Sequence, residues 1–344
     1  MKNIRIAIIG AGVWGETHAA IYREHPWADP VAVCDMKKER AEDIAERYGI
    51  GRVFTSVDDL LAWGEFDAVS IVTPDHLHVD IAVKCAEAKK HMLIEKPIAT
   101  TREDTLRIVD AARKNGVRVM VDLHNRFSPP FAAAKQAVEE GRLGTLKTGY
   151  FRLNDIKWVA TDMLSWSAQS SILWFLGSHS LDTLQWLFND RVKRVYCVST
   201  SGVLKEEGVD TVDSYLSTLE FEHGGIAQME NGWITPNANP CVNDIKCNLC
   251  GDKGMIAIDA SNHNLIRLYT DTKAEVPDII VRNKVFGQVK GFAYESIRSF
   301  ADCLASGEPF HVSMEDAAKT TIALLAIIES SKTHMPVEIE YGFE

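Results

Sequence analysis

The stretch Gly10-Ala11-Gly12-Val13-Trp14-Gly15 decides the fold of this chain, because it joins an apolar segment to a segment of helical pattern. In a strand–turn–helix unit, glycines at this spacing permit a tight turn, a close approach of a pyrophosphate, and close contact of helix and strand. The backbone N–H groups of the turn and the N-terminus of the helix then face the anion. All six residues are therefore predicted to form a dinucleotide-binding turn.

A carboxylate follows at the position that such a turn requires. Asp35 closes the second predicted strand, 20 residues after Gly15. At this spacing a carboxylate hydrogen-bonds the ribose hydroxyls of the adenosine and repels a 2′-phosphate. Lys37 and Lys38 could accommodate that phosphate, although both are more typical of solvated residues in a first helical turn. We therefore expect NAD as the cofactor, with NADP as the alternative.

Strands and helices alternate through the first 123 residues. The expected strands are apolar almost throughout, as in a parallel sheet that is buried on both faces. Alternation of this kind predicts right-handed crossover units and a doubly wound Rossmann domain over residues 1–123. Strands are predicted at residues 4–9, 31–34, 68–73, 91–95 and 117–123, and helices at residues 16–23, 37–48, 75–89 and 102–115.

The pattern changes to short consecutive strands in residues 124–344, between helices predicted at 131–140, 173–188, 292–305 and 314–331. Consecutive strands joined by short turns are typical of a largely antiparallel sheet. The predicted fold class is thus α/β plus α+β, with an open-faced sheet in the second domain. Its helices could cover only one face of that sheet, which leaves the other for a partner subunit.

The charge and the cysteines exclude several classes of function. The chain has 37 basic and 48 acidic side chains, for a net charge of −11, which argues against nucleic acid or an anionic membrane as a partner. No apolar run reaches the roughly 18 residues that span a bilayer, so we expect a cytoplasmic protein. The seven cysteines form no disulfide framework. Cys247 and Cys250 have the C-x-x-C spacing, but no second pair accompanies them, so we expect no metal site.

The chemistry of the chain is expected at the carboxyl ends of the predicted strands, where parallel sheets bind ligands. Glu95 and Lys96 end one strand, and Thr73 and Pro74 end the preceding one, where they could form a wall under the nicotinamide ribose. An ammonium there can stabilise a developing alkoxide, although Lys96 could also be a strand-end lysine paired with Glu95. For His78, a structural role and a role beside the cofactor remain equally open.

Three of these stretches together resemble the Gfo/Idh/MocA family, named after glucose-fructose oxidoreductase, inositol dehydrogenase and the rhizopine-catabolism protein MocA. The resemblance rests on residues 10–15, 73–78 and 95–97, and it extends over the whole chain through residues 126–129, 141–144, 177–182, 251–254 and 313–317. The family implies oxidation or reduction of a secondary alcohol on a sugar, an inositol or a related polyol. It also implies homodimers or homotetramers that assemble through the C-terminal sheet.

The resemblance assigns catalytic roles to Lys96, which would contact the reacting oxygen and the nicotinamide ribose, and to His179, which would accept the hydroxyl proton. It also suggests a cis peptide before Pro97. Many members carry an aspartate four residues before the histidine, whereas this chain has Phe175. Asp182, one helical turn after His179, could orient the imidazole instead. Alternatively, Lys96 is the base and His179 only binds substrate.

Polar groups and flat apolar rings gather in residues 154–174, a mixture that suits a polyhydroxylated ring. Asn154, Asp155 and Trp166 are the expected pocket residues, together with His179 and Asp182. Arg126 could face the same cleft or form a salt bridge between domains.

The leading hypothesis is an NAD-dependent sugar or polyol dehydrogenase. An NAD-assisted glycosidase of the same family and a non-catalytic, ligand-sensing regulator on the same scaffold are the alternatives. The presence of Lys96 and His179 counts against the regulator, and Phe175 counts slightly for it.

Overall fold

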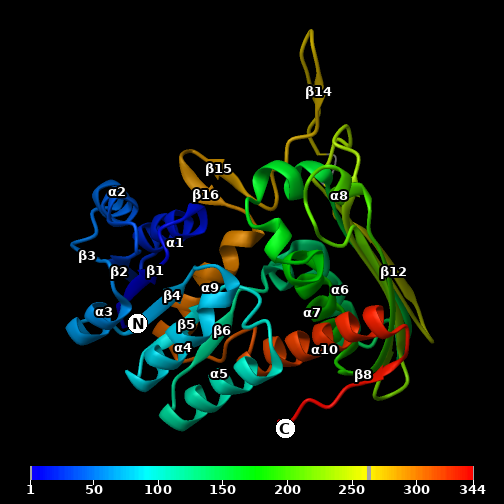
Figure 1. Cartoon of the computed structure of the whole chain (residues 1–344), viewed down its shortest axis with the longest axis horizontal. Coiled ribbons are helices and arrows are strands. Elements are labelled where there is room, and N and C mark those ends of the chain that lie inside the picture. The colour runs from blue at the N-terminus through cyan, green and yellow to red at the C-terminus, as the bar shows by residue number, and fades with distance from the viewer. Residues whose placement is uncertain (1, 262–264, 344) are drawn as a thin grey trace. The chain divides into compact units, whose positions relative to one another are not determined.

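The computed structural model describes residues 2–261 and 265–343. The chain divides into two compact units, of which the first holds Met1–His124 and Lys284–Thr321, and the second holds Asn125–Asn283 and Ile322–Glu344. The first unit consists of two separate stretches of the chain, so it differs from the single domain boundary that the sequence predicts at residue 123. The reason is helix α9 (Phe292–Ser306), which packs against the first strand and the first helix of the chain (Figure 1).

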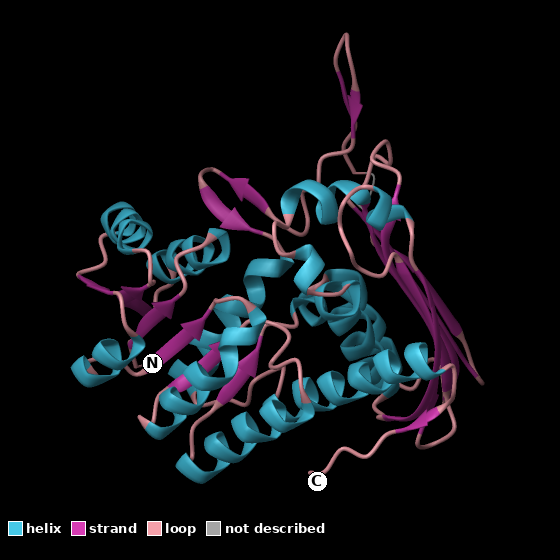
Figure 2. Cartoon of the chain, in the orientation of Figure 1, coloured by secondary structure: helices cyan, strands magenta, loops and turns pink. Residues whose placement is uncertain are grey.

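A six-stranded parallel sheet forms the centre of the first unit, in the order β3-β2-β1-β4-β5-β6 (Figure 2). Its strands are β1 (Ile4–Ile9), β2 (Ala28–Cys34), β3 (Arg52–Phe54), β4 (Ala68–Ile71), β5 (His91–Ile94) and β6 (Val119–Val121). The chain first builds outward from β1 to β3 and then crosses to the other side of β1. Ligands bind open α/β sheets at such a change of direction, outside the carboxyl ends of the strands.

Helices flank this sheet, as the alternating pattern predicts. They are α1 (Val13–Glu24), α2 (Lys38–Tyr48), α3 (Val57–Trp63), α4 (His78–Glu87) and α5 (Arg102–Asn115), in addition to α9. Helix α5 begins with a side-chain cap, because the Thr101 hydroxyl accepts a hydrogen bond from the Asp104 N–H at 3.1 Å. The N-cap of α1 is Gly12, which offers no side chain to its first N–H groups. Strand β3 and helix α3 were not predicted from the sequence, because both are very short.

A seven-stranded sheet forms the second unit, in the order β12-β11-β7-β10-β9-β8-β17. Its strands are β7 (Leu146–Ile156), β8 (Val192–Thr200), β9 (Ser214–Phe221), β10 (Ile226–Thr235), β11 (Asn243–Gly251), β12 (Met255–Asp259) and β17 (Val337–Glu338). The pairing is antiparallel between all of these neighbours for which a register is resolved, except between β7 and β10, which run parallel. The prediction of a largely antiparallel sheet is confirmed.

The remaining elements of the second unit lie around this sheet. They are α6 (Pro129–Glu139), α7 (Ser178–Phe188), α8 (Val203–Glu206) and the hairpin of β13 (Leu268–Tyr269) and β14 (Ala274–Glu275). Further along the chain, a second hairpin, β15 (Asn283–Val285) and β16 (Gln288–Lys290), leads into α9 of the first unit, and α10 (Met314–Thr333) begins in the first unit and ends in the second. The helix predicted at residues 173–188 is a π-helical turn, Leu173–Gly177, followed by α7.

The two faces of the second sheet differ in character. Along β7, Phe151 and Leu153 are buried in the core of the unit, whereas Tyr150 and Arg152 point to the opposite face. Helices α6 and α7 contact only the core-facing side (Figure 1). The outer face carries exposed apolar side chains, namely Tyr196, Val198, Leu216 and Ile226.

No helix in the described part of the chain is long and apolar enough to span a membrane.

Candidate active site

The glycine turn between β1 and α1 has the geometry that its sequence predicts. Gly10 adopts φ of +106°, and its N–H donates to the carbonyl of Cys34 at 2.8 Å. A Cβ atom on Gly15 would lie 1.9 Å from the carbonyl oxygen of Gly10, so only glycine permits this contact of helix and turn. A Cβ atom on Gly12 would meet no atom within 4 Å. Open space therefore adjoins the uncapped N-terminus of α1, where a pyrophosphate fits.

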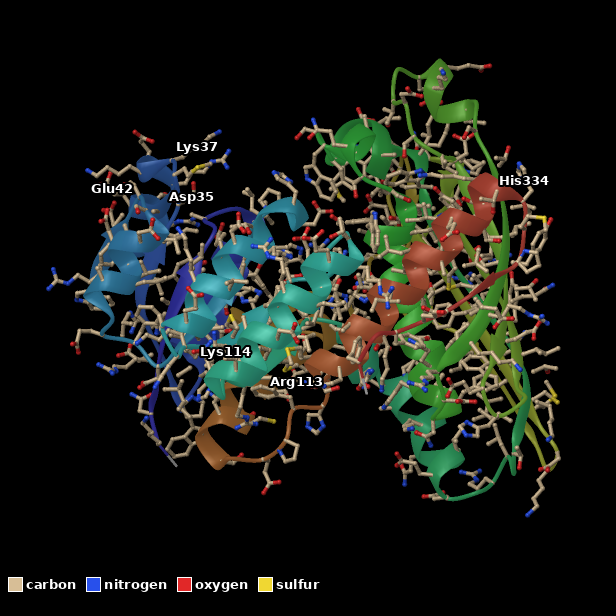
Figure 3. The ribbon with its side chains drawn as sticks, turned by 60° about the horizontal axis from the view of Figure 1, so that its bottom comes forward. Asp35, Lys37, Glu42, Arg113, Lys114 and His334 are labelled. Atoms are coloured by element: carbon tan, nitrogen blue, oxygen red, sulfur yellow. The ribbon has the colours of Figure 1, made fainter. Side chains whose placement is uncertain are left out.

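Asp35 joins the end of β2 directly to this turn. One of its carboxylate oxygens accepts the N–H of Ala11 at 2.7 Å, and the other accepts the N–H of Lys37 at 2.8 Å. Figure 3 shows Asp35 and Lys37 at the same end of α2. The Lys38 ammonium lies 2.8 Å from the Glu42 carboxylate, so Lys38 has an anionic partner on its own helix.

Two apolar side chains beside this turn are exposed, Val13 at 78% and Met36 at 85%. Exposed apolar residues next to an open anion site are the groups that the adenosine of a dinucleotide would cover. The open helix terminus, the carboxylate and these side chains together fit NAD.

His78 connects the chain after β4 to the chain after β5. Its side chain is buried, with Nδ1 2.9 Å from the carbonyl oxygen of Pro97 and Nε2 2.9 Å from that of Thr73. Burial lowers the pKa of His78, against the opposing effect of its two carbonyl partners. The structural role for His78 is thus present, and a contact with the cofactor remains a prediction. The Thr73 hydroxyl is also buried, and no partner for it lies within the described ranges.

Glu95 and Lys96 follow β5 at the carboxyl edge of the first sheet. The N–H of Glu95 donates to the carbonyl of Ile71, at the end of the neighbouring strand β4. The Lys96–Pro97 peptide bond is cis, as the family resemblance suggests. Lys96 is half-buried. Burial raises the pKa of Glu95, against the opposing effect of the Lys96 charge.

Sequence reasoning missed a buried polar cluster around Glu95. His18 of α1 places Nε2 3.3 Å from a Glu95 carboxylate oxygen, and Asp122, which follows β6, completes a group of three ionisable side chains. Ser296 of α9 donates to the Asp122 carboxylate. The available signals were a histidine three residues after Gly15 and an aspartate at the end of an apolar strand.

His179 lies in the first turn of α7, in the second unit, where it is 4% exposed. Asp182, on the same helix, accepts two hydrogen bonds from Arg126, at 2.9 Å from Nε and 2.5 Å from Nη2. Both partners are buried. Two predicted site residues therefore lie together, as an ion pair within the second unit. Arg126 could bind substrate, and Asp182 could orient His179, only while they are also bound to each other.

The three residues predicted from the 154–174 segment are not brought together. Asn154 lies on the outer face of β7 and donates to Glu230 at 2.6 Å, whereas Asp155 is buried on the core-facing side and accepts from Asn243. Successive residues of a strand point to opposite faces, so these two cannot line one pocket. Trp166 is partly exposed, with its ring edge-on to Phe175 at 6.1 Å. An aromatic contact thus replaces the expected carboxylate at position 175.

Two family models match this chain. One, described as an oxidoreductase family with an NAD-binding Rossmann fold, matches residues 4–123, and the other, the Gfo/Idh/MocA C-terminal domain, matches residues 131–257. The chain belongs to the Gfo/Idh/MocA family. It is an oxidoreductase whose Rossmann domain binds NAD, and the resemblance stated from the sequence is confirmed.

Several members of this family are similar to the chain over most of its length. Levoglucosan dehydrogenase of Pseudarthrobacter phenanthrenivorans is 29% identical over 75% of this chain and 74% of the relative. The scyllo-inositol 2-dehydrogenase (NAD(+)) of Bacillus subtilis is 26% identical over 98% of this chain and 97% of the relative. A crystal structure of a putative myo-inositol dehydrogenase from Sinorhizobium meliloti has a TM-score of 0.83 at 25% identity, covering 98% of this chain and all of that one.

Proposed function

We propose that this oxidoreductase transfers a hydride between NAD and a secondary alcohol of a sugar, an inositol or a related polyol. The observation that carries the proposal is the position of Lys96, an ammonium directly after β5 on the same sheet edge as the open glycine turn. The names of the relatives point the same way, since they are dehydrogenases of an anhydrosugar and of an inositol.

The residues of the first unit would hold the cofactor. The turn of residues 10–15 would bind the pyrophosphate, Asp35 the adenosine ribose, and Thr73, Pro74, His78 and Glu95 the surroundings of the nicotinamide ribose. NAD, when bound, supplies the hydride acceptor. NADP is disfavoured because the Asp35 carboxylate would repel its 2′-phosphate.

Lys96 and His179 would carry the acid–base chemistry. A hydride leaves a carbinol carbon readily only if the hydroxyl proton is taken up at the same time. His179 is proposed to take that proton, and Lys96 to polarise the reacting oxygen through its ammonium. The Arg126–Asp182 ion pair would then fix the first turns of α7 and so position His179, with Asp155 and Trp166 as weaker candidates for substrate contacts. Asn154 is not among them, because it lies on the opposite face of β7.

The test is a panel of sugars, inositols and sugar acids, incubated with the purified protein and NAD while NADH absorbance is followed. NADH formation with one class of polyol supports the proposal. Cleavage of an aryl glycoside without net NADH formation would instead support the glycosidase. Binding of NAD and a polyol with no turnover at all would support the regulator.

We further propose that the protein assembles as a homodimer or homotetramer through the outer face of its C-terminal sheet. Leu216 is 55% exposed in the middle of β9, and Tyr196 and Val198 lie on the adjacent strand β8. Contiguous exposed apolar residues on an open sheet face mark an interaction surface.

A further inference from the structure

The buried cluster around Glu95 contains two carboxyl groups to which the proposed reaction assigns no acid–base role. His18 and Asp122 are fully buried, and the Glu95 side chain is 12% exposed. One polar atom from each of the three lies within 4.8 Å of the others. Burial of two carboxyl groups so close together is costly if both are ionised, because like charges repel strongly in a medium of low polarity.

The contacts of the two carboxyl groups are unequal. The second Asp122 oxygen, Oδ2, is buried and has no hydrogen-bond partner among the described residues, so a negative charge there would be poorly stabilised. Glu95 has the imidazole Nε2 of His18 at 3.3 Å and lies in the field of the Lys96 ammonium. Asp122 has the Ser296 hydroxyl as a donor instead. The negative charge is therefore better stabilised on Glu95, and the proton on Asp122.

Two other ionisable groups near the pair, His18 and Tyr22, are uncharged near pH 7. Burial lowers the pKa of His18 to about 4, so His18 is neutral near pH 7. Burial raises the pKa of Tyr22, also on α1, and keeps its phenol protonated. His124 places Nδ1 3.8 Å from an Asp122 oxygen, on the chain that follows β6. Lys96, at the end of β5, is a charged neighbour of Glu95.

We propose that Glu95 and Asp122 hold one proton between them and act as a singly charged, buried counter-ion that positions the Lys96 ammonium. This inference rests on the proposed role of Lys96 in the reaction. Glu95 and Asp122 are positioning residues, since they act through Lys96. A second negative charge, formed when the shared proton leaves at high pH, would draw the ammonium toward the pair and away from the reacting oxygen, so turnover would fall.

Two substitutions test the shared proton and the negative charge of the pair separately. Asp122→Asn imitates the protonated acid and leaves the Glu95 charge in place, whereas Glu95→Gln removes that charge. We expect kcat at pH 7 to fall at least about tenfold more in Glu95→Gln than in Asp122→Asn. The high-pH decline of kcat should be lost in Asp122→Asn. Asp67→Asn, the same change in a carboxyl group paired with Arg5 before β4, is the matched control and should leave the pH profile as it is.

The infrared spectrum tests the shared proton without any need for turnover. The wild type should show the C=O stretch of a protonated carboxyl group from about pH 5 to well above the usual range of Asp and Glu, and Asp122→Asn should abolish it. Absence of this band from the wild type would overturn the inference even if the variants fail to fold. So would equal effects of the two substitutions, or a tightly bound divalent cation that Asp122→Asn releases. If instead Lys96→Met stays active while the band is present, the proposed role of Lys96 fails and the shared proton stands.

Discussion

At the residue scale, Asp35 and His78 are held by backbone groups rather than by other side chains. Asp35 accepts two backbone N–H groups, and His78 lies between two backbone carbonyls. Such contacts follow the path of the chain, so they fix the side chains relative to the turns that would bind the cofactor. A sequence pattern predicts Asp35, because its spacing from Gly15 is typical. Asp122 could not be predicted, because its partners His18, Glu95 and Ser296 come from three other segments.

Removal of the Asp35 side chain tests its role at the ribose. Asp35→Ala loses two charge-assisted hydrogen bonds to the glycine turn and the acceptor for the ribose hydroxyls, at a cost of about 1.5–3 kcal/mol for each strong bond. We expect the Kd of NAD to rise at least about tenfold, and that of NADP to rise less. Isothermal titration of both dinucleotides measures the difference. Equal weakening would remove the ribose role.

The buried imidazole of His18 makes the stability of the protein depend on pH. Its pKa is lowered by burial from 6.5 to about 4, so the unfolded chain binds a proton over an interval in which the folded chain does not. Its contribution to the free energy of unfolding is therefore complete above pH 6.5 and decreases as the pH falls toward 4, by up to about 3 kcal/mol.

Urea denaturation of the wild type and of His18→Gln at several pH values measures this contribution. Gln does not titrate, so the difference in unfolding free energy between the two proteins should become smaller as the pH falls. A difference that stays constant would mean that the pKa of His18 is the same in the folded and the unfolded chain.

At the element scale, the strand–turn–helix unit of β1 and α1 does what its glycines predict, and the parallel strands follow from their uninterrupted apolar sequences. The short elements β3 and α3 escape such reasoning, because three to seven residues carry too little periodicity. Alternation along β7 also limits the substrate pocket, since Asn154 and Asp155 face opposite sides. Helix α9 joins the first unit through packing against α1, which no local pattern indicates.

Two substitutions in the glycine turn should both weaken NAD binding but differ in their effect on folding. Gly15→Ala places a Cβ atom 1.9 Å from a backbone oxygen, so it should destabilise the first unit and abolish NAD binding together. Gly12→Ala meets no protein atom, so thermal unfolding should change by less than about 1 kcal/mol.

The same Gly12→Ala variant should nevertheless bind NAD at least about tenfold more weakly, because its Cβ atom fills the space left for the pyrophosphate. Calorimetric titration with NAD measures the loss of affinity in each variant, and thermal unfolding curves measure the loss of stability. Full NAD affinity in Gly12→Ala would place the pyrophosphate elsewhere.

At the scale of the whole molecule, one unit carries the cofactor turn and Lys96, and the other carries His179 and an open apolar sheet face. The sequence predicts the folds of both units, because alternating strands and helices in one and consecutive short strands in the other can be read from local patterns. Its order of elements does not reveal that residues 284–321 return to the first unit, since that depends on packing between distant segments.

The outer face of the second sheet gives a test of assembly. Leu216→Glu buries a charge in the proposed interface and should dissociate the oligomer, as measured by size-exclusion chromatography with light scattering. Val203→Glu makes the same change at an exposed apolar residue of α8 and serves as the control. Dissociation by Val203→Glu alone, or a monomeric wild type, would contradict assembly through this face.

The central claim is that the Lys96 ammonium acts on the reacting alcohol, and turnover by Lys96→Met tests it most directly. With the best polyol from the panel and saturating NAD, this variant should form no measurable NADH. Its NAD affinity should stay within about tenfold of the wild type, or about 1.4 kcal/mol, because the dinucleotide is held mainly by the glycine turn and Asp35. Undiminished NADH formation by Lys96→Met would contradict the account.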